Sequence, residues 1–183
     1  MLLPSFLQFL AFEKRYSHHT IAAYRRDLEQ LDHFLQDLPG QPTLTTAQPI
    51  HIRQWLVQGL EQGLSARSIN RKLSSCKTFY RFAEKKGALQ HNPMLKVTAP
   101  KVKKKLPAYV EQKPMRYLLE LMAEDDSFVG QRNRLIIELF YSTGMRRAEL
   151  IGLQLKDVDL SQQTLRVLGK GNKERILSIG KDV

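Results

Sequence analysis

The spacing of apolar residues in the first half of the chain predicts a bundle of short helices. Apolar side chains recur every three or four positions in four segments, which is the period of a helix with one buried face. These segments are residues 3–15, 17–38, 47–62 and 65–87. Ser17 and Ser65 stand at the start of the second and fourth segments, where a side-chain oxygen can accept a free backbone N–H. The first half is therefore predicted to be a small all-α domain.

The fourth segment has an apolar face and, opposite to it, a basic one. The apolar face consists of Ile69, Leu73, Cys76, Tyr80 and Ala83. The opposite face, which we call the basic stripe, consists of Arg67, Arg71, Ser74, Thr78, Arg81 and Lys85. The stripe contains no acid, whereas a solvated helix face usually mixes both signs. It suits phosphates and the base edges of a major groove, and a plain solvent-facing surface is the alternative. Arg25 and Arg26 are further candidates, although Asp27 and Glu29 stand beside them.

The second half has a mixed pattern. Helices are predicted at residues 112–123 and 134–142, and Gly144 can close the latter in the left-handed conformation. "RRAELIGLQL" begins another helical turn. Two strands follow at residues 164–168 and 174–179, and "GKGN" between them has the glycines and asparagine that a tight turn requires.

The segment "TAPKVKKKLPAYV" separates the two halves. Pro100 and Pro107 bracket a basic run, and both proline and repelling like charges favour an extended chain. The run contains Lys101, Lys103, Lys104 and Lys105. We therefore predict a helical domain at residues 1–98, a linker at 99–108 and a second domain at 109–183. The linker could contact a polyanion, or it could be an ordinary solvated loop.

Charge and composition narrow the function classes. The chain has 29 Lys and Arg against 18 Asp and Glu, a formal net charge of +11. An excess of this size indicates a polyanionic partner, namely DNA, RNA or an acidic membrane surface. The single cysteine, Cys76, and the lack of a Cys/His cluster predict neither a disulfide nor a metal site, which fits a cytoplasmic protein. The apolar N-terminus lacks a basic leader and a cleavage site, so we interpret it as an amphipathic helix, and no run is long enough to span a membrane.

Two basic residues are candidates for chemistry. Arg146 follows the predicted helix end and opens a new helical turn, where a guanidinium could clamp two phosphate oxygens. Glu149 lies three residues on and could hold Arg146 in place, although a surface ion pair is the simpler reading. Lys170 stands between Gly169 and Gly171 at the predicted hairpin tip, with Lys173 and Arg175 nearby. It could donate a proton to a phosphate ester, and a solvated turn is the alternative.

The stretch "YSTGMRRAELIGLQLKDVDL…TLRVLGKGNKERILSIG" resembles the first half of the catalytic domain of the tyrosine recombinases, specifically the Xer type. That family shows Thr-Gly-Leu-Arg-x-x-Glu-Leu followed by a Gly-Lys-Gly-Asn-Lys-Glu-Arg hairpin. "SHHTIAAYRRDLEQL" is similar to the family's core-binding domain, and "NP" at Asn92 and Pro93 precedes the linker as it usually does. Met145 replaces the more usual leucine.

The resemblance implies a mainly α fold: a four-helix, SAM-like core-binding domain, then part of a mixed α/β catalytic domain with a small β-hairpin. It implies DNA cleavage by a tyrosine through a 3′-phosphotyrosyl link, without a cofactor or metal, by protomers that form a tetramer on paired sites. Arg146 matches a catalytic arginine that stabilises phosphate charge, and Lys170 matches the lysine that protonates the leaving 5′-oxygen. Glu149 matches an acid that supports the arginine. The residues predicted to contact DNA are those of the basic stripe with Arg25, Arg26, Lys103, Lys104, Lys105, Lys173 and Arg175.

The family's remaining catalytic groups do not occur in this sequence. They are a His-x-x-Arg motif, a further His or Trp and the nucleophilic tyrosine, all downstream of the hairpin, whereas Tyr141 is the last tyrosine here. We therefore expect a fragment that does not cleave DNA alone, with exposed apolar surface on its second domain. Its function is expected to be Xer-like chromosome or plasmid dimer resolution, or mobile-element integration. The alternatives are a non-catalytic DNA-binding regulator and a basic RNA-binding protein.

Overall fold

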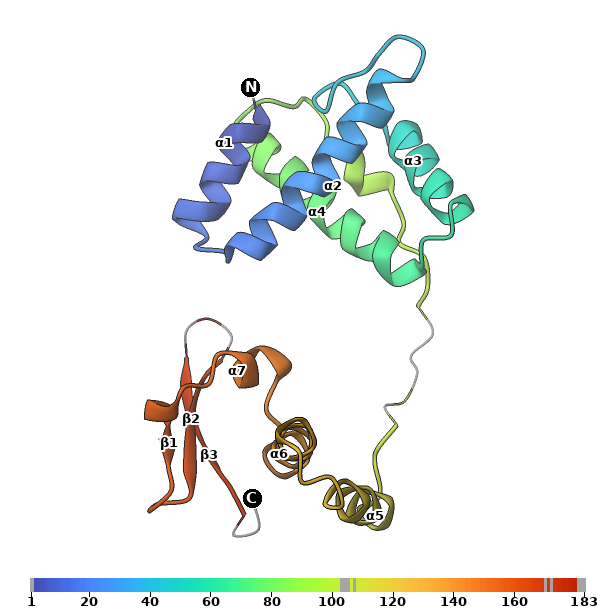
Figure 1. Cartoon of the computed structure of the whole chain (residues 1–183). Coiled ribbons are helices and arrows are strands. Elements are labelled where there is room, and N and C mark those ends of the chain that lie inside the picture. The colour runs from blue at the N-terminus through green and yellow to red at the C-terminus, as the bar shows by residue number, and fades with distance from the viewer. Residues whose placement is uncertain (1, 103–105, 107, 170, 172, 181–183) are drawn as a thin grey trace. The chain divides into compact units, whose positions relative to one another are not determined.

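A computed structural model describes residues 2–102, 106, 108–169, 171 and 173–180. The chain divides into two compact units, Met1–Lys105 and Leu106–Val183, which we call unit 1 and unit 2 (Figure 1). None of the helices among the described residues is both long and apolar enough to cross a membrane.

Unit 1 begins with a helix that changes its winding. The α-helix α1 (Leu2–Gln8) continues as a π-helical turn, η1 (Phe9–Glu13), where a single helix over residues 3–15 was expected. In the wider turn the N–H of Lys14 donates to the carbonyl of Phe9 at 3.1 Å. Leu10 is fully buried within this turn, so the wider winding keeps an apolar side chain in the core.

The next helices follow the predicted caps. Helix α2 (His18–Gln36) begins where Ser17 Oγ accepts the N–H of Thr20 at 3.3 Å. Helix α3 spans Pro49–Glu61, with proline in its first turn. Helix α4 (Ala66–Lys85) begins where Ser65 Oγ accepts the N–H of Ser68 at 3.2 Å. A short 3-10 turn, η2 (Pro93–Lys96), follows. Both predicted serine caps are confirmed.

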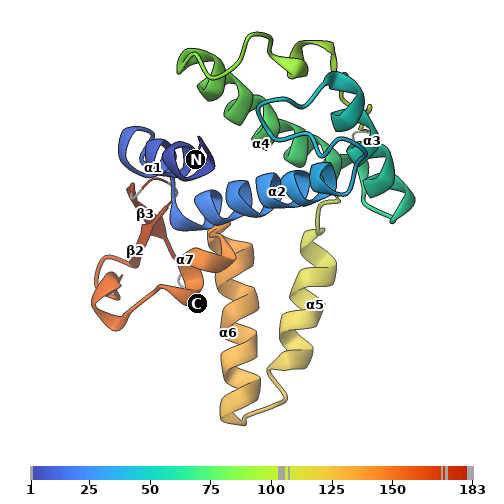
Figure 2. The same ribbon diagram turned by 90° about the horizontal axis from the view of Figure 1, so that it is seen from above.

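The core of unit 1 lies between α1, α2, α3 and α4, and α2 packs against α4 at an angle (Figure 2). The predicted apolar face of α4 is confirmed, because every one of its members is buried. Phe6 of α1 is fully buried, and its ring meets Phe79 of α4 edge to face at 5.4 Å between centroids. This packing fixes α4 and so determines which of its side chains face outward.

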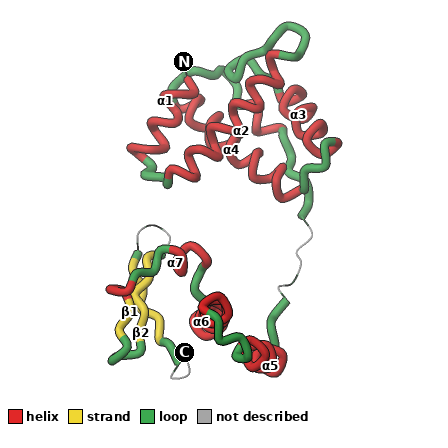
Figure 3. Tube along the Cα trace, viewed as in Figure 1, coloured by secondary structure: helices red, strands yellow, loops and turns green. Residues whose placement is uncertain are grey.

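Unit 2 places helices before a small sheet (Figure 3). Its helices are α5 (Gln112–Met122), α6 (Phe128–Thr143) and α7 (Arg147–Ile151), followed by the 3-10 turn η3 (Leu155–Asp157). The strands β1 (Val158–Asp159), β2 (Thr164–Leu168) and β3 (Glu174–Ser178) form an antiparallel sheet in the order β1-β2-β3. The predicted hairpin is confirmed, and β1 is a third strand that was not predicted.

The core of unit 2 is sparse among the described residues. Its buried members are Leu139, Met145, Leu165 and Val167. Helix α5 buries none of its residues. Leu118, Leu121 and Tyr117 of α5 and Leu135 and Tyr141 of α6 are exposed. The apolar surface expected on these two helices is therefore present.

Candidate functional site

Arg146 is projected outward by the way α6 ends. Gly144 adopts a left-handed conformation (φ 61°, ψ 24°), and its N–H donates to the carbonyl of Phe140 at 3.0 Å. Met145 then turns into the core of unit 2. Arg146 caps α7, and its side chain is 63% exposed. The interruption of an apolar stretch by two arginines thus has a local cause: a glycine turn and a buried methionine place the first arginine at the surface.

The carboxylate of Glu149 binds Arg146 through two hydrogen bonds. Its Oε2 accepts the backbone N–H of Arg146 at 2.7 Å, and its Oε1 accepts from the Nη1 of Arg146 at 2.8 Å. The carboxylate of Glu149 is almost completely buried. The backbone N–H of Arg146 is therefore not free to bind an external anion, because the chain's own carboxylate accepts it. The guanidinium alone is left to meet a ligand.

Arg175 is the second partner of Glu149. From β3, its Nη2 donates to the Oε2 of Glu149 at 2.8 Å. The Nε of Arg175 is buried without a hydrogen-bond partner in the described part of the chain. Sequence reasoning placed Arg175 among the DNA-contacting residues and did not predict this pairing. The two residues are 26 positions apart, and the ladder that pairs Val167 with Arg175 brings them together.

These contacts keep Glu149 ionised. The backbone N–H of Arg146, followed by the Arg175 and Arg146 guanidinium groups, lowers the pKa of Glu149 to about 2, while burial acts in the opposite direction. Hydrogen bonds to the charged form of a carboxyl group have this effect. Two guanidinium groups thus share one carboxylate, which leaves the cluster with a net positive charge.

Gly169 brings the hairpin against this cluster. A Cβ at Gly169 would lie 3.2 Å from the carbonyl oxygen of Lys173, 3.4 Å from Oε1 of Glu149 and 3.9 Å from Nη1 of Arg146. Its N–H donates to the carbonyl of Lys173 at 2.7 Å. The absence of a side chain therefore permits a close approach of hairpin and ion pair. Lys170 comes next in the sequence, but it lies outside the described residues, and Lys173 is exposed.

The basic stripe of α4 lies at the surface with one exception. Arg67, Arg71, Ser74, Arg81 and Lys85 are exposed, and Thr78 is half-buried. The hydroxyls of Ser74 and Thr78 donate to the carbonyls of Asn70 and Ser74, each at 2.9 Å. Because these hydrogens are already used, the two hydroxyls can offer only lone pairs to a base edge. The arginines are the stronger candidates.

Arg71 is not the unpaired cation that the helical pattern predicted. Its Nη1 and Nη2 both donate to Asp27 of α2, the latter at 2.7 Å, and Asp27 is completely buried. Ser75 Oγ also donates to Asp27, at 2.7 Å, and Lys72 Nζ lies 3.7 Å from it. Burial lowers the pKa of Lys72, and Asp27 opposes that shift.

Sequence reasoning missed this buried cluster. In the sequence Asp27 stands between Tyr24 and Leu28, on the apolar side of α2. This position could have predicted that its side chain is buried. Since Asp27 points inward, it does not lie beside Arg25 and Arg26 at the surface. Both of those arginines are exposed and have no ion-pair partner among the described residues, as is true of Arg67, Arg81 and Lys85.

The predicted linker is described only in part. Lys101 is exposed, whereas Lys103, Lys104 and Lys105 lie outside the described residues. The carbonyl of Pro100 accepts from Nδ2 of Asn70 at 3.1 Å, so α4 holds the chain beyond residue 98.

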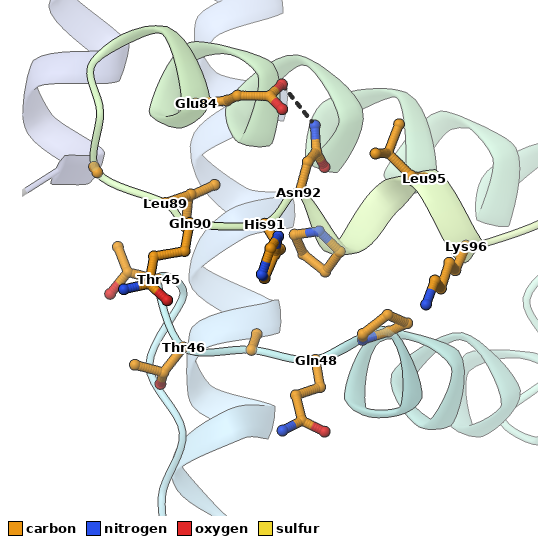
Figure 4. Close-up of a pocket in the computed structure, with 14 residues that line it drawn as sticks. Thr45, Thr46, Gln48, Glu84, Leu89, Gln90, His91, Asn92, Leu95 and Lys96 are labelled. Carbon is orange, nitrogen blue, oxygen red and sulfur yellow. Dashed lines mark hydrogen bonds between the residues drawn. The ribbon is translucent and has the colours of Figure 1, made fainter.

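A cavity of about 980 Å³ in unit 1 lies between the residues before α3 and the segment that follows α4 (Figure 4). Its walls carry mixed polar groups, and inside it Asn92 Nδ2 donates to Glu84 Oε2 at 3.1 Å. The residue of α4 that lines this cavity is Glu84. The cavity therefore contains an acid, whereas the basic stripe contains none. No group of three or more His, Cys, Asp or Glu side chains able to hold a metal occurs in the described ranges.

Comparison with known proteins identifies the family. The profile "Phage integrase, N-terminal SAM-like domain" matches residues 3–87, and the profile "Phage integrase family" matches residues 109–183. The chain therefore belongs to the phage integrase family. It is 38% identical over 178 residues to the tyrosine recombinase XerC of Staphylococcus haemolyticus, and 37% identical over 181 residues to XerC of Pseudomonas putida. These alignments cover 97% and 98% of this chain, which spans 59% of each relative's length.

Solved structures agree on the fold. A Tn1549 transposon integrase in complex with circular intermediate DNA matches with a TM-score of 0.70 and 20% identity, over 100% of this chain and 61% of that one. A lambda integrase tetramer bound to a Holliday junction matches with a TM-score of 0.72 and 20% identity, over 97% and 49%. The SAM-like helical domain and the partial catalytic domain expected from the sequence are thus confirmed.

Proposed function

We propose that this chain provides the DNA-binding unit and the first part of the active site of a site-specific DNA recombinase. The observation that carries the proposal is the exposed Arg146 guanidinium, held by the buried carboxylate of Glu149 beside the hairpin that contains Lys170. The identity to XerC proteins over nearly the whole chain supports it. In this proposal the reaction breaks and rejoins DNA through a 3′-phosphotyrosyl intermediate, and it resolves chromosome or plasmid dimers.

The roles of the site residues follow from charge and placement. Arg146 binds the scissile phosphate and stabilises the charge that grows on it in the transition state. Removal of one such fixed donor costs about a hundred- to a thousandfold in rate. Glu149 keeps the guanidinium oriented, and Arg175 shares that carboxylate. Lys170 protonates the leaving 5′-oxygen, a role that rests on the match to the family's hairpin.

Within the 183 residues, no tyrosine follows Tyr141 and no histidine is followed three positions later by arginine. We therefore propose that these residues alone bind DNA without cleaving it. Incubation with a nicked suicide duplex is expected to give no covalent protein–DNA adduct on a denaturing gel. A covalent adduct would contradict this part of the proposal.

The proposed DNA contacts come from both units. In unit 1 they are the arginines and Lys85 of the basic stripe, together with Arg25 and Arg26. In unit 2 they are Arg146, Lys173 and the outward part of Arg175. Residues 99–108 are proposed as a linker that contributes Lys103, Lys104 and Lys105 to the same duplex. The proposed partners are duplex DNA and further recombinase protomers on paired sites. The proposed place of action is the cytoplasm, where such DNA lies.

The salt dependence of duplex binding tests the electrostatic basis of the proposal. The logarithm of the affinity is expected to fall linearly with the logarithm of salt concentration, with a slope of about −0.9 per phosphate neutralised. Arg146→Ala is expected to weaken binding more than Arg147→Ala, a control at the next position, which is exposed and unpaired among the described residues. Fluorescence anisotropy with a labelled mixed-sequence duplex measures both effects. An affinity that does not change with salt would refute the electrostatic basis of the proposal, and equal losses would refute the role of Arg146.

A non-catalytic regulator that occupies recombination sites is the second candidate, because the exposed basic stripe of unit 1 supports DNA binding without any catalytic residue. The reading frame after codon 183 distinguishes the two. A continuing frame that encodes His-x-x-Arg and a late tyrosine supports the recombinase, and an immediate stop codon supports the regulator.

A further inference from the structure

Asp27 is an acid with no exposure to solvent, located where α2 meets α4. Its hydrogen bonds and ion pairs with α4 come from three side chains. Both terminal nitrogens of Arg71 donate to it, Ser75 Oγ donates at 2.7 Å, and Lys72 Nζ lies 3.7 Å away. A buried carboxylate is costly unless it is paired and hydrogen-bonded. These contacts meet that condition, and they hold the Asp27 carboxylate in one position inside unit 1.

Arg71, which is bound to this carboxylate, is partly exposed at the surface. Arg71 has five N–H groups, and two of them are donated to Asp27. The other three have no hydrogen-bond partner among the described residues, and the side chain is 51% exposed. Arg71 is thus a half-exposed guanidinium with two of its N–H groups bound to a buried anion and three left unpaired among the described residues. On the same stripe, Arg67 and Arg81 lack such an anchor.

We propose that Asp27 is a positioning residue for DNA recognition, which holds the outward edge of Arg71 in one orientation against the duplex. The inference rests on the proposed function. An unanchored arginine must lose rotamer freedom when it binds, whereas Arg71 has lost it already on folding. Bidentate contacts to phosphate or guanine depend on the orientation of the guanidinium plane, so a fixed plane also favours selectivity.

The sign of one substitution separates positioning from simple charge. Asp27→Asn removes a negative charge behind the DNA-facing stripe. If only long-range electrostatics mattered, this change would tighten binding to a polyanion. If Asp27 acts by fixing Arg71, the same change weakens binding. The expected loss is about three- to tenfold, the factor that immobilising one flexible side chain is worth.

The experiment is a double-mutant cycle on the whole chain with a labelled mixed-sequence duplex. Asp27→Asn is measured in the wild-type background, in the Arg71→Ala background and in the Arg81→Ala background, at a temperature where far-UV circular dichroism shows each variant folded. We expect the Asp27→Asn loss to vanish in the Arg71→Ala background, because the residue through which it acts is gone. The loss should persist in the Arg81→Ala background.

Tighter or unchanged binding by Asp27→Asn would overturn the inference, and so would an equal loss in the Arg71→Ala background, which would indicate a general structural role. Should Asp27→Asn fail to fold, Ser75→Ala removes one hydrogen bond to Asp27 and keeps its charge. A smaller loss that again depends on Arg71 is expected, and a loss independent of Arg71 would overturn the inference. If the wild-type chain does not bind duplex DNA, the proposed function fails first and the inference fails with it.

Discussion

Arg71→Ala is expected to destabilise unit 1, although the residue lies on the surface. The change leaves Asp27 buried with only Ser75 and Lys72 as partners. It removes two charge-assisted hydrogen bonds, each worth about 1.5–3 kcal/mol in a protein. Because half of the Arg71 side chain is exposed and two partners remain, the loss should lie at or just below the bottom of the summed range of about 3–6 kcal/mol. We expect a loss of roughly 2–3 kcal/mol in the free energy of unfolding.

Trp55 provides the assay. It is the only tryptophan of the chain and is buried in the core of unit 1, so its fluorescence reports the unfolding of that unit. Lys72, the neighbour of Arg71, lies over its ring at 5.0 Å. In thermal melts the expected loss corresponds to a fall in midpoint of roughly 10–20 °C for a unit of this size.

Arg81→Ala is the matched control for this measurement. Arg81 lies on the same helix, is exposed and has no ion-pair partner in the described part of the chain. Its removal is expected to change stability by less than about 0.5 kcal/mol. If Arg71→Ala and Arg81→Ala shift the Trp55 transition equally, the buried carboxylate does not depend on Arg71 and the reasoning fails.

Three further predictions concern the carboxylate of Glu149, the turn at Gly144 and the core of unit 1. The pKa of Glu149 is about 2 in the fold against an ordinary value of 4.5, so its contribution to the stability of unit 2 is present above pH 4.5 and is lost as pH falls toward 2; hydrogen exchange of β2 and β3 amides should show this loss, and Glu149→Gln should reduce the pH dependence, the rest of which comes from Asp125 and Asp159, whose pKa values are also lowered. Gly144→Ala should cost about 1–2 kcal/mol because φ is 61°, whereas Gly180→Ala, at an open position without positive φ, should be neutral by the same exchange measurement. Phe6→Ala should cost about 3–5 kcal/mol by Trp55 fluorescence, since Phe6 is fully buried, while Phe12→Ala, at a residue 78% exposed, should leave the transition in place; equal shifts would mean that α1 contributes little to the core.

Local signals in the sequence were sufficient for much of the helical architecture. The hydroxyls of Ser17 and Ser65 start α2 and α4 as predicted, and Gly144 ends α6 in the left-handed conformation. In each case the cause and the effect lie within four residues of each other. The Arg146–Glu149 pair was predicted for the same reason, since three positions along a helix bring two side chains together.

Contacts between distant segments were not predictable in the same way. Asp27 and Arg71 are 44 positions apart, and Glu149 and Arg175 are 26 apart. A periodic pattern states which face of a helix is apolar, but it does not state which polar side chain of another element will meet it. Both arginines were therefore assigned to DNA as free cations, although each is tied to a buried acid. The π-turn at η1 and the two-residue strand β1 likewise depend on tertiary packing and not on a local signal.

The buried position of Cys76 has a practical consequence. Burial raises the pKa of this thiol to about 12, and it is the only cysteine in the chain. Since the thiolate is the reactive form, the native protein offers no competing site for maleimide dyes. Cysteines introduced at the exposed positions of Gln62 and Lys113, which are not among the proposed DNA contacts, would take up a donor and an acceptor dye. Energy transfer between them would then measure the separation of the two units in solution, with and without a duplex, in an otherwise unaltered sequence.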